Sequence, residues 1–204
     1  ELCEKTGANW EEVRRALKMD RRIGEHAYLA PGLGISGGNL ERDLSTVEYL
    51  SGEQTETSIV SAFRKNSIWR KGWPGRTLVD VFGNKLESKN ITLWGLSYKA
   101  DTHSLKNAAS LELLSILRGN RVDIYDPIVK GFAPESTRHT IRFNALEACQ
   151  GADALIVITP WKEFSSIHPS EVASVMKGNI VLDPFGCLNR DEWKSAGFNV
   201  IRLG

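Results

Sequence analysis

The second half of the chain alternates short apolar runs with segments of helical spacing, and this alternation restricts the possible folds more than any other feature. Apolar runs that predict strands cover residues 90–96, 121–125, 152–159, 179–183 and 199–203, with a weaker candidate at 140–143. Helical spacing covers residues 108–117, 145–149, 169–176 and 190–196. Because strands that alternate with helices pair in parallel, the pattern predicts an α/β fold with a doubly wound parallel sheet of about five strands.

The carboxyl ends of these predicted strands indicate where a ligand would bind, because open parallel sheets take ligands at that edge. Lys99 follows the first strand and is placed to meet a phosphate near a helix N-terminus, although a solvated loop lysine is the commoner interpretation. Trp161 and Phe164 follow a later strand and fit either stacking on a base or sugar or, more safely, packing in the core. The residues at the strand ends are Gly95-Leu96, Asp126-Pro127, Thr159-Pro160 and Asp183-Pro184.

The first half of the chain has helical patterns separated by glycine-rich breaks. Asn9 has the position of a helix N-cap. Residues 27–44 are rich in glycine and predict a long loop. After the loop, Ser45 and Glu48 have capping-box spacing, which predicts a helix that runs with interruptions to about residue 70.

The boundary between the two halves is predicted at the polar residues 83–90, which resemble a linker. Before them, Pro74 fits the first turn of a helix that runs to about residue 82. The chain opens on Glu1, without an initiator methionine and within a pattern typical of a last helical turn, so we expect it to be part of a longer protein. The expected units are residues 1–86, which are helical and contain the glycine-rich loop, and residues 87–204, which contain the sheet.

Composition and charge argue against several classes of protein. The chain has 204 residues, with 26 Lys+Arg against 25 Asp+Glu and a formal net charge of +1, which disfavours a nucleic-acid binder or a membrane-surface binder. Its apolar runs are much shorter than the roughly 18 residues of a transmembrane helix. Three widely spaced cysteines predict neither a disulfide framework nor a zinc site, and they favour a reducing, cytoplasmic setting. The four dispersed histidines predict no metal site.

Gly32, Gly34 and Gly37 match the spacing G-x-G-x-x-G of a dinucleotide-binding turn. That turn requires a preceding strand and a helix that starts within the motif. Pro31 precedes the glycines and the next helix is predicted only near Ser45, so a nicotinamide-cofactor site is disfavoured. The better interpretation is a loop whose backbone amides closely approach an anion or a sugar hydroxyl.

Motifs in order along the chain resemble the nucleotide-sugar dehydrogenase family, that is, the UDP-glucose and GDP-mannose dehydrogenases. The resemblance covers the central and C-terminal regions of the family, and Asn66 matches an asparagine of its long central helix. The matching segments are residues 4–8 (EKTGA), 20–24 (DRRIG), 31–43 (PGLGISGGNLERD), 95–102 (GLSYKADT), 125–127 (YDP) and 159–164 (TPWKEF).

The resemblance implies a helical central-domain portion followed by a Rossmann-like sheet domain that holds the nucleotide diphosphate of a UDP- or GDP-sugar. It also implies a homodimer that associates through the first 82 residues. The family uses NAD, bound mainly by an N-terminal Rossmann domain that we expect to lie outside this chain. No nucleic acid and no membrane partner is implied.

Residue roles carry over from the same resemblance, position by position. Lys99 would meet the diphosphate or the sugar, and Arg22 would reach the sugar site of the partner subunit. Asp43 would act near the reacting hydroxyl, and Arg42, which replaces a lysine of the family, would contact the cofactor. The loop glycines would cover the sugar with backbone groups; they are Gly32, Gly34, Gly37 and Gly38.

Asn39 stands where the family has its catalytic cysteine. Oxidation of a primary alcohol to an acid takes two hydride transfers, and a thiolate enables the second by forming a thiohemiacetal and then a thioester that water cleaves. A carboxamide only forms hydrogen bonds. The sequence therefore leaves open a dehydrogenase, a non-catalytic nucleotide-sugar-binding relative that keeps the cleft and the dimer, and an interaction domain whose loop is structural only. Further departures from the family pattern lie at His103, Ser104, Lys106, Pro160 and Phe185.

Overall fold

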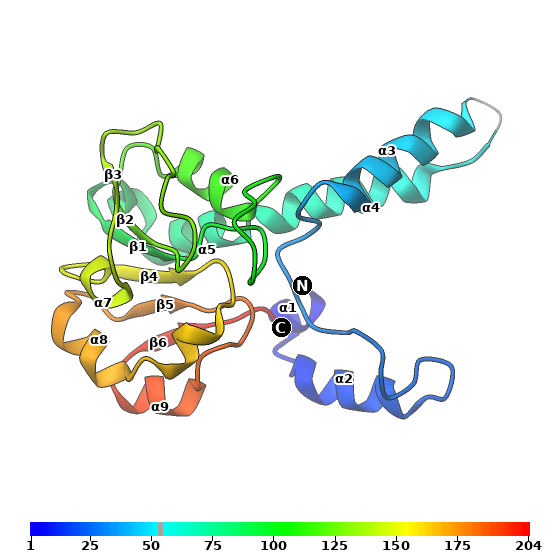
Figure 1. Ribbon diagram of the computed structural model, residues 1–204. Helices are drawn as coiled ribbons and strands as arrows, with labels where there is room; N and C mark the ends of the chain where they lie inside the picture. The colour runs from blue at the N-terminus through cyan, green and yellow to red at the C-terminus, as the bar shows by residue number, and fades with distance from the viewer. Residues whose placement is uncertain (53–54) are drawn as a thin grey trace.

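The computed structural model describes residues 1–52 and 55–204. Within them, six parallel strands form one sheet in the order β3-β2-β1-β4-β5-β6 (Figure 1). This confirms the α/β fold with a parallel sheet and corrects the expected number of about five strands. The additional strand is the weak candidate, which pairs with β2 at the margin of the sheet. The strands are β1 (Asn90–Trp94), β2 (Arg121–Tyr125), β3 (His139–Ile141), β4 (Ala154–Val157), β5 (Ile180–Leu182) and β6 (Asn199–Ile201).

The centre of the sheet is continuously apolar. Leu93 of β1 lies opposite Ile124 of β2 and Ile156 of β4 in the parallel register. All three side chains are fully buried. A strand covered on both faces has no solvent-facing side, which is why these segments read as apolar runs rather than as an alternating pattern.

Helices cover both faces of the sheet, as a doubly wound fold requires (Figure 1). On one face, α5 (Trp73–Phe82) and α6 (Ala109–Ile116) bury Leu78 and Leu113 in a common core. On the other face, the Trp94 ring stacks on Phe164 with ring centroids 5.0 Å apart and meets the edge of Trp193. The elements that pack there are α7 (Ala145–Ala148), α8 (Pro169–Val175), α9 (Arg190–Ser195) and the 3₁₀ helix η2 (Lys162–Ser166).

The first part of the chain is helical. α3 (Asn39–Ser51) and α4 (Ser58–Lys71) form a hairpin that projects from the sheet, and Glu48 joins them through Arg64 and the Ser61 hydroxyl. Figure 1 shows α1 (Leu2–Thr6) beside the C-terminus and α2 (Trp10–Met19) next to it. The Asn9 cap is confirmed, because its side chain accepts a hydrogen bond from the Glu11 N–H at 2.9 Å.

Two expectations about the first part are wrong. The loop predicted over residues 27–44 ends earlier, because α3 begins at Asn39 with Gly38 as its N-cap. Ser45 was expected to cap a helix, but its hydroxyl donates to the Glu41 carbonyl at 2.9 Å inside α3. The helix therefore starts two residues after Gly37, the last glycine of the G-x-G-x-x-G segment, although no strand precedes that segment in residues 1–31, all of which are described.

The predicted linker at residues 83–90 is also ordered as the 3₁₀ helix η1 (Gly83–Ser88) before β1. Leu86 packs on the core, and its carbonyl accepts from the Asn120 side chain at 2.6 Å. Trp73 and Leu78 of α5 lie in that core as well, and the division into units at residue 86 remains a prediction. Among the described helices, none is both long enough and apolar enough to cross a membrane.

Candidate functional site

The glycine-rich loop packs through its backbone against α4. Gly34 has φ +82°, a left-handed conformation that glycine adopts without strain. A Cβ at this position would lie 2.5 Å from the backbone oxygen of Ser67. The next residue, Ile35, donates its N–H to the Ser67 hydroxyl at 2.7 Å. The loop reaches α4 this closely because position 34 carries no side chain.

The same loop also contacts the segment between β1 and α6. Gly37, with φ +78°, donates its N–H to the Lys106 carbonyl at 3.0 Å. A Cβ on Gly37 would lie 3.0 Å from the Tyr98 ring, and one on Gly38 would meet the Lys106 side chain. The loop is therefore held between the helical hairpin and the carboxyl end of the first strand.

Asp126, directly after β2, organises the neighbouring strand ends. Its carboxylate is almost completely buried and accepts hydrogen bonds from four backbone N–H groups and one indole. Several donors of this kind compensate the cost of burying a carboxylate. Trp161 and Phe164 are buried, in agreement with core packing. The donors are Leu96 N (2.7 Å), Ser97 N (3.2 Å), Ile128 N (2.9 Å), Val129 N (2.8 Å) and Trp161 Nε1 (3.2 Å).

A cavity of about 530 Å³ lies where the loop faces the ends of β1 and β4. Lys99 brings a cation to it, with Nζ 5.6 Å from the centre of the Tyr98 ring. No Asp or Glu from the described part of the chain lines this cavity. One lysine, tyrosine rings and polar side chains suit a ligand that combines phosphate with a sugar or base. The lining includes Tyr28, Gly32, Gly34, Ser36, Asn66, Arg70, Ser97, Tyr98, Lys99, Ile158, Pro160 and Phe185.

Of the residues predicted from the sequence, Gly32, Gly34 and Lys99 line this cavity. Gly37 and Gly38 belong to the same loop and make its contacts with Tyr98 and Lys106. The structure thus brings together in space a loop and a lysine that lie more than 60 residues apart in the sequence.

The other predicted residues lie outside the cavity lining. Asn39 and Asp43 are exposed and four residues apart, so they share one face at the start of α3. Arg42 is ion-paired with Asp43 at 3.0 Å. Arg22 is exposed and ion-paired with Asp20 at 2.6 Å, on the loop that follows α2. The roles implied for these four residues remain predictions.

None of the three cysteines, all within the described residues, lines the loop cavity. Cys149 is buried, and burial raises the pKa of its thiol to about 12. Burial and the neighbouring Asp183 raise the pKa of the Cys187 thiol as well. Cys3 lies in α1 and lines a different cavity. A nucleophilic thiolate is therefore absent from the described lining of the loop cavity.

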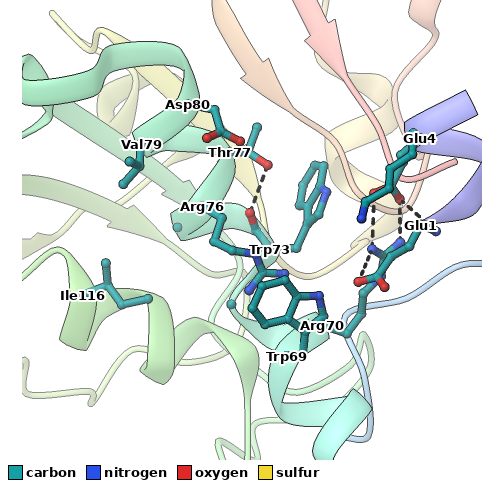
Figure 2. Close-up of a pocket in the computed structure, with 13 residues that line it drawn as sticks. Glu1, Glu4, Trp69, Arg70, Trp73, Arg76, Thr77, Val79, Asp80 and Ile116 are labelled. Carbon is teal, nitrogen blue, oxygen red and sulfur yellow. Dashed lines mark hydrogen bonds and ion pairs between the residues drawn. The ribbon is translucent and has the colours of Figure 1, made fainter. Parts of the chain in front are cut away.

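A second cavity, of about 570 Å³, lies between α1, α4 and α5 (Figure 2). Figure 2 shows Trp69 beside Arg76, whose guanidinium is 3.7 Å from the ring centre. Arg70 lines both cavities, but its guanidinium is ion-paired with Glu4 at 2.6 Å and with Glu1 at 3.4 Å. These partners balance the charge of Arg70, so Lys99 is better placed to meet an anionic ligand in the loop cavity.

The sequence interpretation did not assign Tyr28, Arg70 or Tyr98 to the site. Tyr98 lies inside residues 95–102, a segment that resembles the family, and this resemblance could have indicated it as a site residue. Tyr28 and Arg70 had no such signal, because they reach the cavity only through the packing of the loop on α4.

Two models of one protein family match the chain. Residues 1–67 match the central domain of the UDP-glucose/GDP-mannose dehydrogenase family, and residues 92–190 match its UDP-binding domain. The chain belongs to the UDP-glucose/GDP-mannose dehydrogenase family. The loop cavity lies between the two matched regions, because its glycines come from the first and Lys99 comes from the second.

Curated relatives from this dehydrogenase family are similar over most of the chain. A UDP-glucose 6-dehydrogenase from Pseudomonas aeruginosa is 31% identical over 89% of this chain and 42% of its own length. One from Rickettsia typhi is 27% identical over 100% of this chain and 48% of its own length. The chain spans about half the length of the curated relatives it matches.

Solved structures of dehydrogenases share the fold. An NDP-N-acetyl-D-galactosaminuronic acid dehydrogenase from Methanosarcina mazei matches with a TM-score of 0.81 at 20% identity, over 96% of this chain and 44% of that one. A UDP-glucose dehydrogenase from Pyrobaculum islandicum matches with a TM-score of 0.74 at 20% identity, over 98% of this chain and 44% of that one. At these identities the likeness shows the Rossmann-like fold alone.

Proposed function

We propose that this chain binds the nucleotide sugar in an NAD-dependent nucleotide-sugar 6-dehydrogenase of the UDP-glucose/GDP-mannose type. The observation that carries the proposal is the cavity of about 530 Å³ between the glycine-rich loop and the strand ends. In this proposal Lys99 meets the diphosphate, because an ammonium group is a common phosphate ligand. The loop supplies backbone groups to the sugar, and the rings of Tyr28 and Tyr98 supply apolar faces.

The chemistry would take place beside this cavity, at the start of α3. Asp43 would orient a water or accept a proton near the reacting hydroxyl, and Asn39, on the same face, would hydrogen-bond the substrate. NAD supplies the hydride acceptor when it is bound. The segment Gly32–Gly37 does not fit it, because no strand precedes the loop in residues 1–31 and Gly34 is packed on α4. NAD would therefore be held mainly outside this chain, with Arg42 in contact.

Asn39 favours one alternative function. A member of the family that has a carboxamide at the position of the cysteine, and no thiol in the described lining of the loop cavity, lacks the nucleophile of the second oxidation. Such a protein would be a non-catalytic nucleotide-sugar-binding relative that retains the cavity. Reduction of NAD by the full-length protein in the presence of UDP-glucose or GDP-mannose would separate the dehydrogenase from this alternative.

We also infer that the protein is a cytoplasmic homodimer that associates through its first 82 residues. Support comes from the α3–α4 hairpin, which exposes large apolar side chains on both helices. Exposed apolar surface of this kind marks association sites. The three free cysteines agree with a reducing compartment.

Calorimetric titration with UDP-glucose and with GDP-mannose tests the binding function. Saturable binding of one of them is expected, and Lys99→Met should weaken it about tenfold because a charge-assisted phosphate contact is lost. Lys194→Met, at an exposed lysine of α9, is the matched control and should bind as the unchanged protein does. The absence of saturable binding for both nucleotide sugars would refute the proposal.

A further inference from the structure

Asn107 connects three elements at the edge of the loop cavity. It lies between β1 and α6 and has φ +54°. Its Nδ2 donates to the Ile35 carbonyl at 3.2 Å and to Glu41 Oε2 at 2.6 Å. Its Oδ1 accepts from the Nζ of Lys71. One side chain therefore contacts the glycine-rich loop, α3 and α4.

The partners of Asn107 require a side chain that both accepts and donates. The ammonium group of Lys71 only donates, whereas the Ile35 carbonyl and the Glu41 carboxylate only accept. A carboxylate at position 107 would face the Glu41 carboxylate without a donor, and an aliphatic side chain would remove an acceptor from a lysine that is 5% exposed. Asparagine also adopts positive φ more readily than most other residues with a side chain.

Lys71 determines which way the amide of Asn107 points. Burial lowers the pKa of Lys71, and the carboxylates of Glu41 and Glu112 partly oppose this effect. With the amide oxygen turned to the ammonium group, the NH₂ group faces Ile35 and Glu41. The reversed amide would place NH₂ against the ammonium group and would leave two acceptors without a donor.

We propose that Asn107 is a positioning residue that fixes the glycine-rich loop and the first turn of α3 over the cavity. Ile35 is held on both sides of its peptide plane, because its N–H donates to Ser67 and its carbonyl accepts from Asn107. Glu41 lies in the first turn of α3 together with Asn39, so the same contact joins Asn107 to the start of the helix that carries Asn39 and Asp43. The inference rests on the proposed function, because it is that function which assigns the loop a ligand.

The variant N107G tests this role without straining the backbone, because glycine accepts the positive φ. D101G is the matched control, since Asp101 lies in the same segment, also has a positive φ (60°), and is exposed. K71M is a second variant, which keeps the Asn107 amide and removes the group that orients it.

Amide hydrogen exchange and titration with UDP-glucose are the two measurements. In N107G we expect the Ile35 and Gly37 amides to exchange about tenfold faster and UDP-glucose to bind about tenfold more weakly, while amides of β1 and β4 keep their rates. D101G should match the unchanged protein in both measurements. With asparagines labelled by ¹⁵N, the side-chain NH₂ signal of Asn107 should exchange slowly and should shift in K71M.

Unchanged exchange at Ile35 and Gly37 in N107G would overturn the inference. Faster loop exchange with unchanged UDP-glucose affinity would overturn it too, because the loop position would then not matter for the ligand. If the unchanged protein binds GDP-mannose and not UDP-glucose, the titrations are made with GDP-mannose. A failure to bind either nucleotide sugar would instead count against the proposed function, and the exchange rates would still decide whether Asn107 fixes the loop.

Discussion

Gly34 and Asp126 hold the segments around the cavity in different ways. Gly34 acts by having no side chain, and Asp126 acts through its carboxylate. At Gly34, the loop lies so close to Ser67 that only a hydrogen atom fits between the two backbones. At Asp126, one carboxylate collects N–H groups from the turns after β1 and β2 and from Trp161. Gly34 lets the loop backbone approach Ser67, and Asp126 fixes the backbone of the turns after β1 and β2.

Gly34→Ala is expected to destabilise the fold by about 1–3 kcal/mol, the usual cost of a strained left-handed residue. The added Cβ would lie 2.5 Å from the Ser67 oxygen at a φ of +82°. Gly32→Ala is the matched control, because a Cβ there meets no atom within 4 Å. Urea denaturation measures both, and equal midpoints for the two variants would contradict the prediction.

Asp126→Asn is expected to cost about 2–3 kcal/mol of stability, because the amide loses an acceptor and places a donor among donors. The buried carboxylate accepts from Leu96 N at 2.7 Å and Val129 N at 2.8 Å, so its replacement affects two strand ends. Asp80→Asn, at an exposed position of α5, is the control. Thermal unfolding of the two variants measures the loss of stability. A loss in D126N no larger than in D80N would show that the hydrogen bonds to Asp126 contribute little to stability.

The surface of the α3–α4 hairpin carries many large apolar side chains, which is unusual for a chain that remains a monomer. The hairpin projects from the sheet, and its two helices join through Glu48. Side chains of this kind are usually buried in a protein core, but on the hairpin they are exposed. They are Leu40, Val47, Tyr49, Leu50, Ile59, Phe63, Ile68 and Trp69.

Light scattering is expected to give about twice the chain mass of 22.7 kDa. Phe63→Glu on α4 should weaken the association at least tenfold, since a buried aromatic anchor would become a charge in an apolar interface. Phe143→Glu is the control, because Phe143 is 90% exposed and lies outside the hairpin. A monomeric unchanged protein, or equal effects of the two variants, would refute a dimer through this element.

At the scale of the whole molecule, the site is formed where the two halves of the sequence meet. The loop comes from the region that matches the central domain, and Lys99 comes from the region that matches the UDP-binding domain. The residues with implied chemical roles, Asn39 and Asp43, stand at the outer start of α3. Asn39 and Asp43 are therefore outside the residues that line the cavity, whereas the loop and Lys99 line it.

Titration of this chain with oxidised NAD is expected to show no saturable binding. The G-x-G-x-x-G segment packs on α4 through Gly34, and no strand precedes it in residues 1–31. Titration with UDP-glucose in the same buffer is the positive control. A micromolar dissociation constant for NAD would overturn this prediction.

The full-length protein, if it is a dehydrogenase, is expected not to complete the oxidation to a sugar acid through a covalent thioester. Asn39 offers no nucleophile, and burial raises the pKa of the Cys149 and Cys187 thiols. Product analysis detects a sugar acid, and the intact mass of the enzyme detects a covalent adduct. Asn39→Cys should create partial second-step activity, with Arg42 and Phe185 limiting recovery. Robust formation of a uronic acid with Asn39 in place would show that another group acts as the nucleophile.

The class of fold could be predicted from the residue pattern alone, because the core strands are buried on both faces and their apolar runs are visible without any tertiary contact. The sequence also indicated the glycine-rich loop and Lys99, since both lie in segments that resemble the family. Local patterns were misleading where tertiary contacts decide. Ser45 has the spacing of a helix cap but lies inside α3. The segment of β3 has only a weak strand pattern, and it forms a strand because it pairs with β2.

The set of residues that line the cavity depends on how distant segments pack together. At Gly34 the backbone of Ser67, 33 residues away in the sequence, leaves no room for a side chain. Asn107 acquires its partners because three segments converge on it. Contacts between residues distant in the sequence leave no periodic signal in it, because each depends on how whole elements pack rather than on local spacing.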